Sequence, residues 1–213
     1  EAGAVKERVA VNMTGGLILK DVYGGGALAD TQTDNWDATA NENAGGWADA
    51  EKKSALHTTT VRLIGGRVGE EVFGGGLGEA GKPAYVWGDV LIDLNGTTSS
   101  GETGTAIADD AKGCVVGQIF GCNNINGTPK GDVLVHVYAT QSPDKDNIST
   151  KPAKGTETFD VEAVYGGGSL AAYEPEGGKN TNKSTKVIID GCGLTSIKQV
   201  YGGGNAAATP ATN

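Results

Sequence analysis

Several residue types are scarce in this sequence, and each scarcity narrows the classes of protein to consider. The 213 residues include 3 cysteines, 6 prolines and 2 histidines. Three cysteines leave at least one unpaired in any compartment, so we expect buried thiols. A disulfide between Cys114 and Cys122 is the alternative if the chain is exported. No stretch approaches the roughly 18 apolar residues of a membrane-spanning helix, which predicts no direct membrane span in this segment. Residues 1–8 also lack the apolar region of a signal peptide.

Basic residues are few and scattered. The chain has 17 lysines and arginines against 26 aspartates and glutamates, which gives a net charge of −9. An acidic chain without a basic cluster is a poor partner for nucleic acids or anionic membranes, so we expect neither. A hydrophobic content of 38% over this length is enough for one core. We therefore expect residues 1–213 to form a single domain.

Glycine, by contrast, is abundant, with 36 residues, more than twice the typical share of about 7%. Low proline excludes collagen, and glycines fixed between β-branched runs exclude a flexible linker. They recur in a motif, Val-aromatic-Gly-Gly-Gly, at residues 22–26, 72–76, 164–168 and 200–204, and in degenerate form at 119–123. Successive aromatic residues are 50, 47, 45 and 36 residues apart, which indicates an internal repeat.

An alternating apolar segment precedes each copy of the motif, at residues 11–15, 61–65, 92–96, 133–137 and 187–191. Four of these segments end at glycine, and their alignment on that glycine gives one uniformly aliphatic face. Such alternation predicts half-buried strands whose aliphatic face points to a common interior.

Each repeat is thus predicted to contain two strands and a polar loop. One repeat cannot bury its apolar face alone, so the repeats must stack, with equivalent strands pairing in parallel at about 4.8 Å. Glycine permits the sharp turns and the close approach of adjacent repeats. We expect an all-β fold, a parallel β-solenoid of about five coils, with long side insertions at residues 31–57, 97–112, 140–158 and 173–184. Because the chain opens into a repeat and stops just after one, we expect a piece of a longer repeat array.

The Val-Tyr-Gly-Gly-Gly copies, with the variant Gly-Gly-Gly-Asn-Ala at residues 202–206, resemble the repeats of large secreted or cell-surface bacterial proteins predicted to form right-handed β-helices. Residues 25–28 and 120–123 are similar, more loosely, to the repeats of polymorphic outer-membrane autotransporter passengers. The resemblance covers nearly the whole chain. It implies a right-handed single-stranded β-helix of the pectate-lyase type and an adhesin-like role in a secreted or cell-surface protein, and it carries over no catalytic residue.

The repeated aromatic and glycine residues are structural candidates. We expect the aromatic rings to form a ladder with one ring in each repeat. An outward ladder could stack against sugars, whereas the interchange of Phe and Tyr favours packing. The residues are Tyr23, Phe73, Phe120, Tyr165 and Tyr201, with Gly24, Gly74, Gly121, Gly166 and Gly202 beside them.

Tryptophan provides the candidates for ligand binding. Trp36 and Trp47 lie in the first polar insertion, and Trp87 lies in a strand-like segment. Exposed tryptophan often marks a protein or carbohydrate contact, so these residues are candidates for contact with glycans or with host or cell-surface proteins. The alternative is that they anchor the insertion onto the repeats.

The evidence for a metal or a cofactor is weak. Residues 144–147 alternate oxygen donors, but they lack the glycine bend and the distal glutamate of a calcium loop. Asp144, Asp146 and Asn147 are therefore weak metal candidates, and a solvated loop is the alternative. We expect no cofactor.

No catalytic residue is assigned. His57 and His136 have no Asp or Ser at a triad-like or metal-ligand spacing, and a single histidine on the outer face of a strand is expected to be exposed. Asp93 and Asp190 fall in different registers two repeats apart, about 10 Å at about 4.8 Å per repeat. That separation disfavours a catalytic pair.

One glycine-rich segment has the pattern of a phosphate-binding loop. Residues 76–82 match the pattern as far as its lysine. At the next and last position, Pro83 replaces the Ser or Thr that would hold magnesium. A phosphate cradle also needs a helix N-terminus, but a strand-like segment follows. We expect no nucleotide.

Two functions remain. The preferred one is a non-enzymatic structural or adhesive module, in which a rigid β-helix displays loops for glycan or protein contact. The alternative is a polysaccharide lyase or glycoside hydrolase on the same scaffold. An enzyme should concentrate carboxylates, or carboxylates with Arg or Lys, on one strand face over consecutive repeats. The outward positions here mix residue types, which favours display.

Overall fold

The computed structural model describes residues 3–33, 58–96, 113–140, 160–175, 183–190 and 195–205, and every regular element in these ranges is a β-strand. The first sheet contains β1 (Ala10–Ile18), β3 (Thr58–Val68), β5 (Asp89–Leu94), β6 (Gly113–Val115), β8 (Val133–Val137) and β10 (Thr185–Ile189). The second sheet contains β2 (Val22–Tyr23), β4 (Glu71–Phe73), β7 (Gln118–Phe120), β9 (Val161–Tyr165) and β11 (Ile197–Tyr201). The predicted all-β class is confirmed for the described residues.

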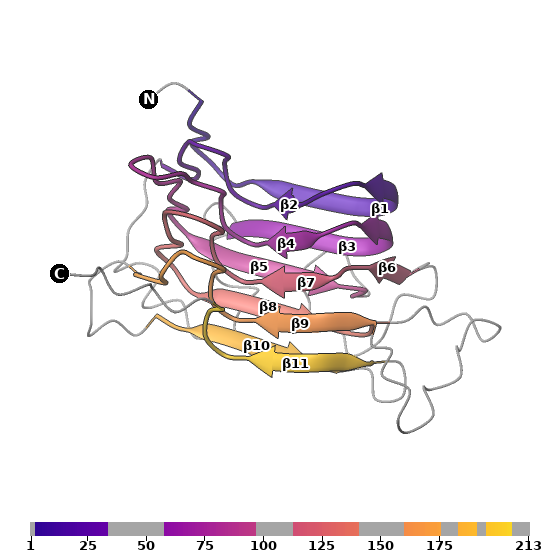
Figure 1. The fold of residues 1–213 in the computed structure, drawn as a ribbon. Helices are drawn as coiled ribbons and strands as arrows, with labels where there is room; N and C mark the ends of the chain where they lie inside the picture. The colour runs from indigo at the N-terminus through magenta and orange to yellow at the C-terminus, as the bar shows by residue number, and fades with distance from the viewer. Residues whose placement is uncertain are drawn as a thin grey trace.

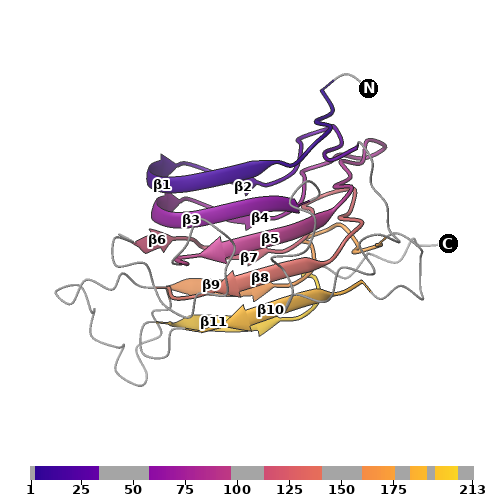
Figure 2. The same cartoon turned by 180° about the vertical axis from the view of Figure 1, so that it is seen from behind.

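Each repeat adds one strand to each sheet, and repeat 3 adds β6 to the first sheet as well. Repeats 1 to 5 consist of β1 with β2, β3 with β4, β5 with β7, β8 with β9, and β10 with β11. All strand pairs are parallel. Figure 1 shows the repeats one below another in chain order, and Figure 2 shows the first sheet from the other side. The predicted parallel stacking of equivalent strands is therefore present.

The hydrophobic core lies between the two sheets. Val61 and Leu63 on β3 and Ile92 on β5 pack in one cluster with Val72 and Ile119 of the second sheet. These positions alternate along each strand, as expected for side chains that point to one face. In the register of the first sheet, aliphatic residues lie directly above one another at Val11, Val61, Ile92, Val135 and Val187.

A third column of backbone pairing runs beside the two sheets, from repeat to repeat. Parallel bridges join Val5 to Thr31, Thr31 to Val86, and Val86 to Pro129. Thr31 N–H donates to the carbonyl of Tyr85 at 2.9 Å. The first expected insertion therefore begins after Gln32, because Thr31 and Gln32 are both buried and belong to the stack.

The second expected insertion interrupts a strand. Both β5 and β6 pair with β3, and residues 97–112 lie between them in the sequence. Asn95 directly follows β5 and has a positive φ of 58°. Its side-chain Oδ1 accepts the Cys114 N–H at 2.7 Å, and its Nδ2 donates to the Ala139 carbonyl at 2.9 Å. One side chain thus connects the broken strand to the next repeat.

The prediction of half-buried strands is wrong for the middle of the first sheet. Every residue of β8 is buried, and on β5 only Leu91 is partly exposed. The reason is lateral packing on the outer face, where the Tyr138 ring lies over His136 and Arg62 lies beside Asp93. Alternation identifies the face toward the core, but it does not show what covers the other face.

Candidate functional site

Polar side chains form a row across the outer face of the first sheet. In the strand register Arg62 on β3 lies opposite Asp93 on β5, and Asp93 lies opposite His136 on β8. These residues alternate with core positions such as Leu63, so they point away from the core. Three consecutive repeats thus place an arginine, an aspartate and a histidine side by side.

The members of this row are in contact. Arg62 Nε lies 3.8 Å from Asp93 Oδ2. The Nε2 of His136 lies 2.7 Å from Oδ2 of Asp190, which follows β10. The His136 ring stacks on Tyr138 with centroids 3.7 Å apart and 18° between the planes. We call Arg62, Asp93, His136, Tyr138 and Asp190 the polar row.

Burial raises the pKa values of two side chains in the polar row, Asp93 and Tyr138. Asp93 is only 5% exposed, and burial raises its pKa to about 6, although Arg62 and His136 oppose the shift. The pKa of Tyr138 rises to about 12, chiefly through burial and then through the charge of Asp93. The Nε of Arg62 is buried and lacks a hydrogen-bond partner. Near neutral pH, Asp93 can therefore hold or release a proton beside an imidazole.

Sequence reasoning missed this arrangement. The expectation that His136 is exposed is wrong, because the residue is 9% exposed and contacts a carboxylate. His136 also stands between Asp93, its neighbour in register, and Asp190, its hydrogen-bond partner. The available signal was the outward position shared by Arg62, Asp93 and His136 once their strands are stacked.

The aromatic residues of the repeated motif form a continuous ladder along the second sheet. Neighbouring rings are nearly parallel, and their centroids are 5.0, 5.0, 4.6 and 4.8 Å apart from Tyr23 to Tyr201. Phe73, Phe120 and Tyr165 form a cluster of their own, separate from the core between the sheets. Because each inner ring has a ring on both faces, its faces are closed to a sugar. Among the described rings, Tyr23 and Tyr201 at the two ends each have one face without a neighbouring ring.

Polar contacts fix the first ring. The Tyr23 hydroxyl donates to Asp21 at 3.2 Å and accepts from Asn124 Nδ2 at 2.8 Å. Burial is the main reason that the pKa of Tyr23 rises to about 12. This ring is therefore held by hydrogen bonds as well as by its stacking on Phe73.

The glycine after each aromatic residue marks the closest approach of adjacent repeats. A Cβ at Gly74 would overlap the carbonyl oxygen of Gly121, and one at Gly121 would overlap that of Gly166. The same overlap occurs at Gly24 and Gly166, whereas a Cβ at Gly202 would meet no atom within 4 Å. Glycine is thus required by packing at four of the five predicted positions.

Of the three tryptophan candidates, the described residues include Trp87. Its indole N–H donates to Asp30 at 3.0 Å, and its ring lies 5.8 Å from that of Tyr85. The Lys130 ammonium lies 4.8 Å from the Tyr85 ring centre and 5.9 Å from that of Trp87. These contacts engage Trp87 with its own chain.

Several predicted residues lie outside the described ranges. They are Trp36, Trp47, Asp144, Asp146, Asn147, His57 and Cys192. Cys114 and Cys122 are described, and both are buried and free. Burial raises the pKa of both thiols, that of Cys114 to about 12.

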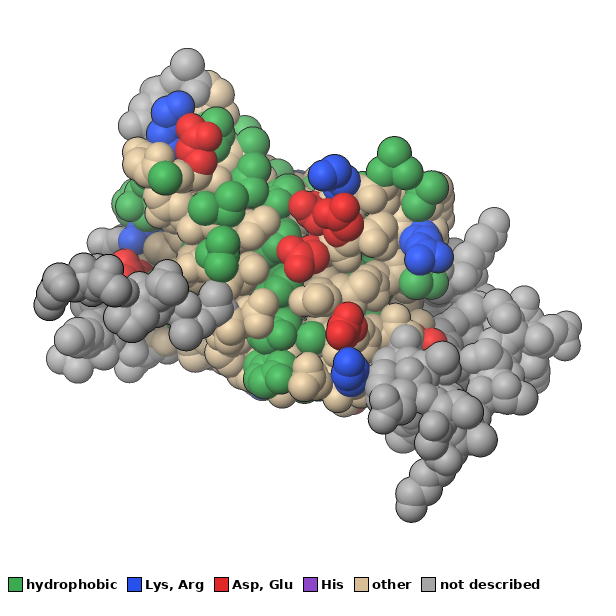
Figure 3. Space-filling model, in the orientation of Figure 1, with side chains coloured by type: hydrophobic (Ala, Val, Ile, Leu, Met, Phe, Trp, Pro, Cys, Tyr) green, Lys and Arg blue, Asp and Glu red, His purple; other side chains and the backbone are tan. Residues whose placement is uncertain are grey.

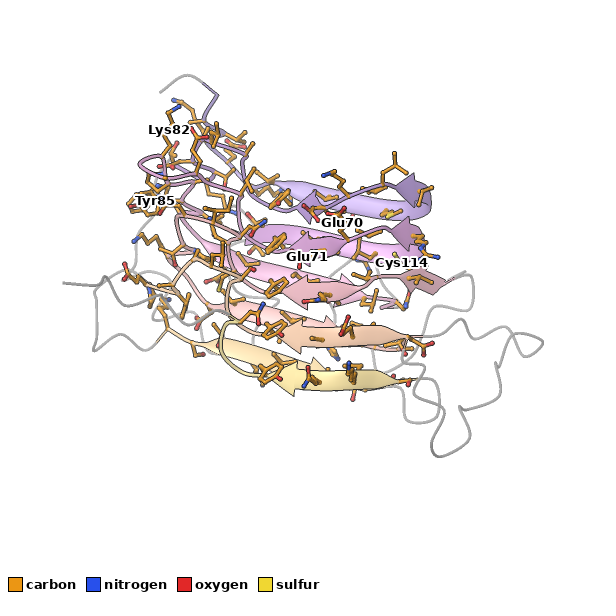
Figure 4. The ribbon with its side chains drawn as sticks, in the orientation of Figure 1. Glu70, Glu71, Lys82, Tyr85 and Cys114 are labelled. Carbon is orange, nitrogen blue, oxygen red and sulfur yellow. The ribbon has the colours of Figure 1, made fainter. Side chains whose placement is uncertain are left out.

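Acidic side chains gather on the outer face of the second sheet. Figure 3 shows Asp and Glu side chains over the middle of this face, and Figure 4 places Glu70 and Glu71 there, by the start of β4. Asp21 accepts the Glu71 N–H at 3.0 Å. The pKa of Glu71 is raised by burial and then by the charges of Asp21 and Glu70.

The segment with the phosphate-loop pattern forms a tight turn. Glu79 and Lys82 exchange two backbone hydrogen bonds, of 3.0 and 2.9 Å. Their side chains also form an ion pair at 2.9 Å. The Lys82 ammonium thus faces a carboxylate of its own turn.

Among the described residues, no three His, Cys, Asp or Glu side chains are grouped as a metal site would require. The described ranges also contain no helix long and apolar enough to cross a lipid bilayer. No protein-family model, no curated protein and no solved structure matches this chain.

Proposed function

We propose that this chain is a parallel β-solenoid that serves as a non-enzymatic structural or adhesive module of a secreted or cell-surface protein. In this proposal the stacked repeats are a rigid support. The polar insertions, which include Trp36 and Trp47, make contact with glycans or with proteins.

One observation carries the proposal: the side chains of the repeated motif are used by contacts between repeats. The aromatic rings stack on one another, and the glycines accommodate the carbonyl groups of the next repeat. A stack built from nearest-neighbour contacts is a stiff rod with variable segments between its strands. A stiff rod with variable segments is better suited to the display of binding loops than to catalysis.

The proposed coil is right-handed. Each repeat joins parallel strands of one sheet through a strand of the other sheet. Crossovers between parallel strands of one sheet are right-handed in about 98% of cases, because of the twist of the strands. The likeness of the Val-Tyr-Gly-Gly-Gly copies to bacterial surface β-helices supports the same hand and the proposed location.

The alternative function is a polysaccharide lyase or glycoside hydrolase, and the polar row is the observation that favours it. Asp93, with its raised pKa, lies opposite His136 in register, and His136 contacts a second carboxylate. A carboxyl group that titrates near neutral pH is suited to general acid catalysis. Against this alternative, Asp93 and His136 are both buried. A polysaccharide could reach them only after the covering part of the chain had moved.

A glycan-array screen of the purified chain tests the proposal. It is run with and without calcium, and reducing or unsaturated sugar ends are assayed in parallel. Binding without product supports an adhesive module, and a Trp36→Ala/Trp47→Ala variant should then lose binding. If the chain neither binds a glycan nor releases sugar ends, the result supports a purely structural role.

Product release would contradict the proposal. In that case Asp93→Asn should abolish turnover if the polar row is the catalytic centre. Glu162→Gln is the matched control, because it removes an exposed carboxylate from the second sheet. Equal activity of the two variants would place catalysis elsewhere in the chain.

A further inference from the structure

A column of exposed apolar side chains runs along the side of the stack. In the first four repeats the chain stays in register after the glycine motif, and Leu28, Gly78, Ile125 and Leu170 share one position of that register. We call Leu28, Ile125 and Leu170 the apolar column. Backbone hydrogen bonds of 2.7–2.9 Å fix the register, from Gly78 to Ala27, from Ile125 to Leu77, and from Leu170 to Asn124.

The three side chains of the apolar column are open to solvent. Leu28, Ile125 and Leu170 are 46%, 43% and 63% exposed. Ile125 belongs to the third of the five repeats and has described repeats on both sides. Its exposure is therefore a property of the side of the stack and not of an end. Single exposed aliphatic residues are common, but a contiguous apolar row that crosses several repeats is typical of an interaction surface.

Gly78 forms a notch in the apolar column. A Cβ at this position would overlap the Asn126 carbonyl oxygen, and the φ of Gly78 is 66°. Stacked repeats are about 4.8 Å apart, so Leu28 and Ile125 are about 10 Å apart with the notch between them. Ile125 and Leu170 are about 5 Å apart. The column thus offers three apolar side chains and one gap at regular intervals.

An acidic group lies beside the apolar column, connected to it by a chain of hydrogen bonds. Asn124, the residue before Ile125, donates to the Tyr23 hydroxyl at 2.8 Å. That hydroxyl donates to Asp21 at 3.2 Å, and Asp21 accepts the Glu71 N–H at 3.0 Å. Figure 3 shows hydrophobic and acidic side chains next to each other on this face.

The charges of the acidic group are not balanced by the described part of the chain. Figure 4 shows Glu70 and Glu71 together on β4. Burial raises the pKa of Glu71, and the charges of Asp21 and Glu70 raise it further. Between described residues, no lysine or arginine forms an ion pair with these three carboxylates. Lys82, in the turn after the notch, pairs with Glu79 at 2.9 Å. A cationic partner would relieve the repulsion within the acidic group.

The backbone of the apolar column is already engaged. The N–H groups of Gly78, Ile125 and Leu170 each donate to the preceding repeat. An extended peptide needs free backbone groups to add to a sheet, and its side chains on one face are about 7 Å apart. Apolar side chains on one face of an α-helix recur about every 5.4 Å along its axis. The helix spacing is close to the spacing of the repeats, and a helix needs only side-chain contacts.

We propose that the apolar column binds one amphipathic helix of a partner protein, and that this helix carries lysine or arginine beside its apolar stripe. The helix lies along the stack, with one apolar side chain in the notch at Gly78. Its basic residues face the carboxylates of Asp21, Glu70 and Glu71. Three exposed side chains bury a small area, so the complex is weak and transient. The inference goes beyond the proposed function, because the side of the stack makes the contact and glycan binding is not required.

Fluorescence anisotropy of a labelled model peptide tests the proposal. The peptide is a helix of about four turns made of Leu, Lys and Ala, with a stripe of Leu on one face and Lys beside the stripe. One control peptide replaces each Lys by Glu, and a second has the same composition in scrambled order. The basic amphipathic peptide should bind about 10-fold more tightly than either control. Added salt should weaken its binding by screening the charges.

Substitutions in the chain locate the bound peptide. Ile125→Ser and Leu170→Ser should each weaken binding by about 5- to 10-fold, because each removes one apolar contact. Glu70→Gln should weaken binding by about 2- to 5-fold and reduce its salt dependence. Val115→Ser is the matched control, because Val115 is also an exposed aliphatic residue but lies on β6, at the far end of the stack from the turns after β2, β4 and β7. Its affinity should equal that of the wild type.

Urea midpoints show whether the variants are folded. Leu170 is the most exposed member of the apolar column, so Leu170→Ser decides the test if Ile125→Ser is unstable. The proposal is overturned if the wild type binds the basic peptide no more tightly than the acidic one. It is also overturned if a folded Leu170→Ser variant binds like the wild type.

The same variants distinguish two other occupants. Sedimentation equilibrium of the chain alone would identify a second copy, if association rises with concentration and is lost in Leu170→Ser. Cosedimentation with phosphatidylcholine vesicles would identify a lipid surface, if it too is lost in Leu170→Ser. Either result would overturn the proposal of a basic helix, whereas a chain that stays monomeric and free of vesicles but binds the basic peptide would support it.

Discussion

The ring of Phe120 lies parallel to that of Tyr165 in the next repeat, with centroids 4.6 Å apart and planes 4° apart. Phe120 also stacks on Phe73 at 5.0 Å. An inner ring of the ladder thus contacts two neighbours, and the last ring, Tyr201, contacts one. The position of a ring in the ladder should therefore decide how much it stabilises the fold.

Phe120→Ala should lower the free energy of unfolding by about 4 kcal/mol, as expected for removing a fully buried aromatic side chain. Tyr201→Ala should cost about 1 kcal/mol, because this ring is partly exposed and has one stacking partner. Urea denaturation followed by circular dichroism measures both values. Equal losses would show that the ladder does not stabilise the fold through contacts between repeats.

Gly121→Ala should destabilise the chain by about 3 kcal/mol or prevent folding. The new methyl group would overlap the Gly166 carbonyl oxygen and would lie 2.6 Å from Cγ1 of Val133. Gly202→Ala is the matched control, and its stability should stay within about 0.5 kcal/mol of the wild type. A well-folded Gly121→Ala protein would mean that adjacent repeats can move apart.

Asp93 should make stability depend on pH in mildly acidic solution. Its pKa rises from 3.8 to about 6 on folding, so the folded chain binds the proton more tightly than the unfolded chain. The contribution of this group to stability is complete below pH 4 and is lost as the pH rises through 6. It amounts to about 3 kcal/mol.

The measurement is the urea midpoint between pH 4 and pH 7 for the wild type and for Asp93→Asn. The variant should lose this part of the pH dependence. Glu162→Gln should keep the wild-type profile, and a wild-type profile for Asp93→Asn would contradict the assignment.

Asn95→Ala should lower the free energy of unfolding by about 3 kcal/mol. The substitution removes the hydrogen bonds to Cys114 and Ala139 and places alanine at a φ of 58°. Asn95→Gly separates the two effects, since glycine adopts this φ without strain but makes no side-chain bonds. Thermal unfolding should rank the wild type first, Asn95→Gly second and Asn95→Ala last. A glycine variant as stable as the wild type would show that the side-chain bonds contribute nothing.

Register could be predicted where a motif marked it. The segments that end at Gly15, Gly65 and Gly96 align in the structure much as their sequences do. The segment at residues 133–137 lacks that glycine, and its register is shifted, because Val135 rather than Val133 lies opposite Ile92. A motif fixes register through a local backbone requirement, and without the motif only the packing of neighbouring strands can set it.

The sequence by itself determined the repeat, the two strands in each repeat and the positions where only glycine fits. These follow from local properties: the period of the apolar residues, the recurrence of Val-aromatic-Gly-Gly-Gly, and the need of stacked backbones for close approach. Tertiary structure alone decided that Arg62, Asp93 and His136 form a buried row and that Asn95 connects a split strand to the next repeat. Those contacts join residues from different repeats, and burial of the outer face depends on side chains packed beside each strand, which no pattern along a single strand records.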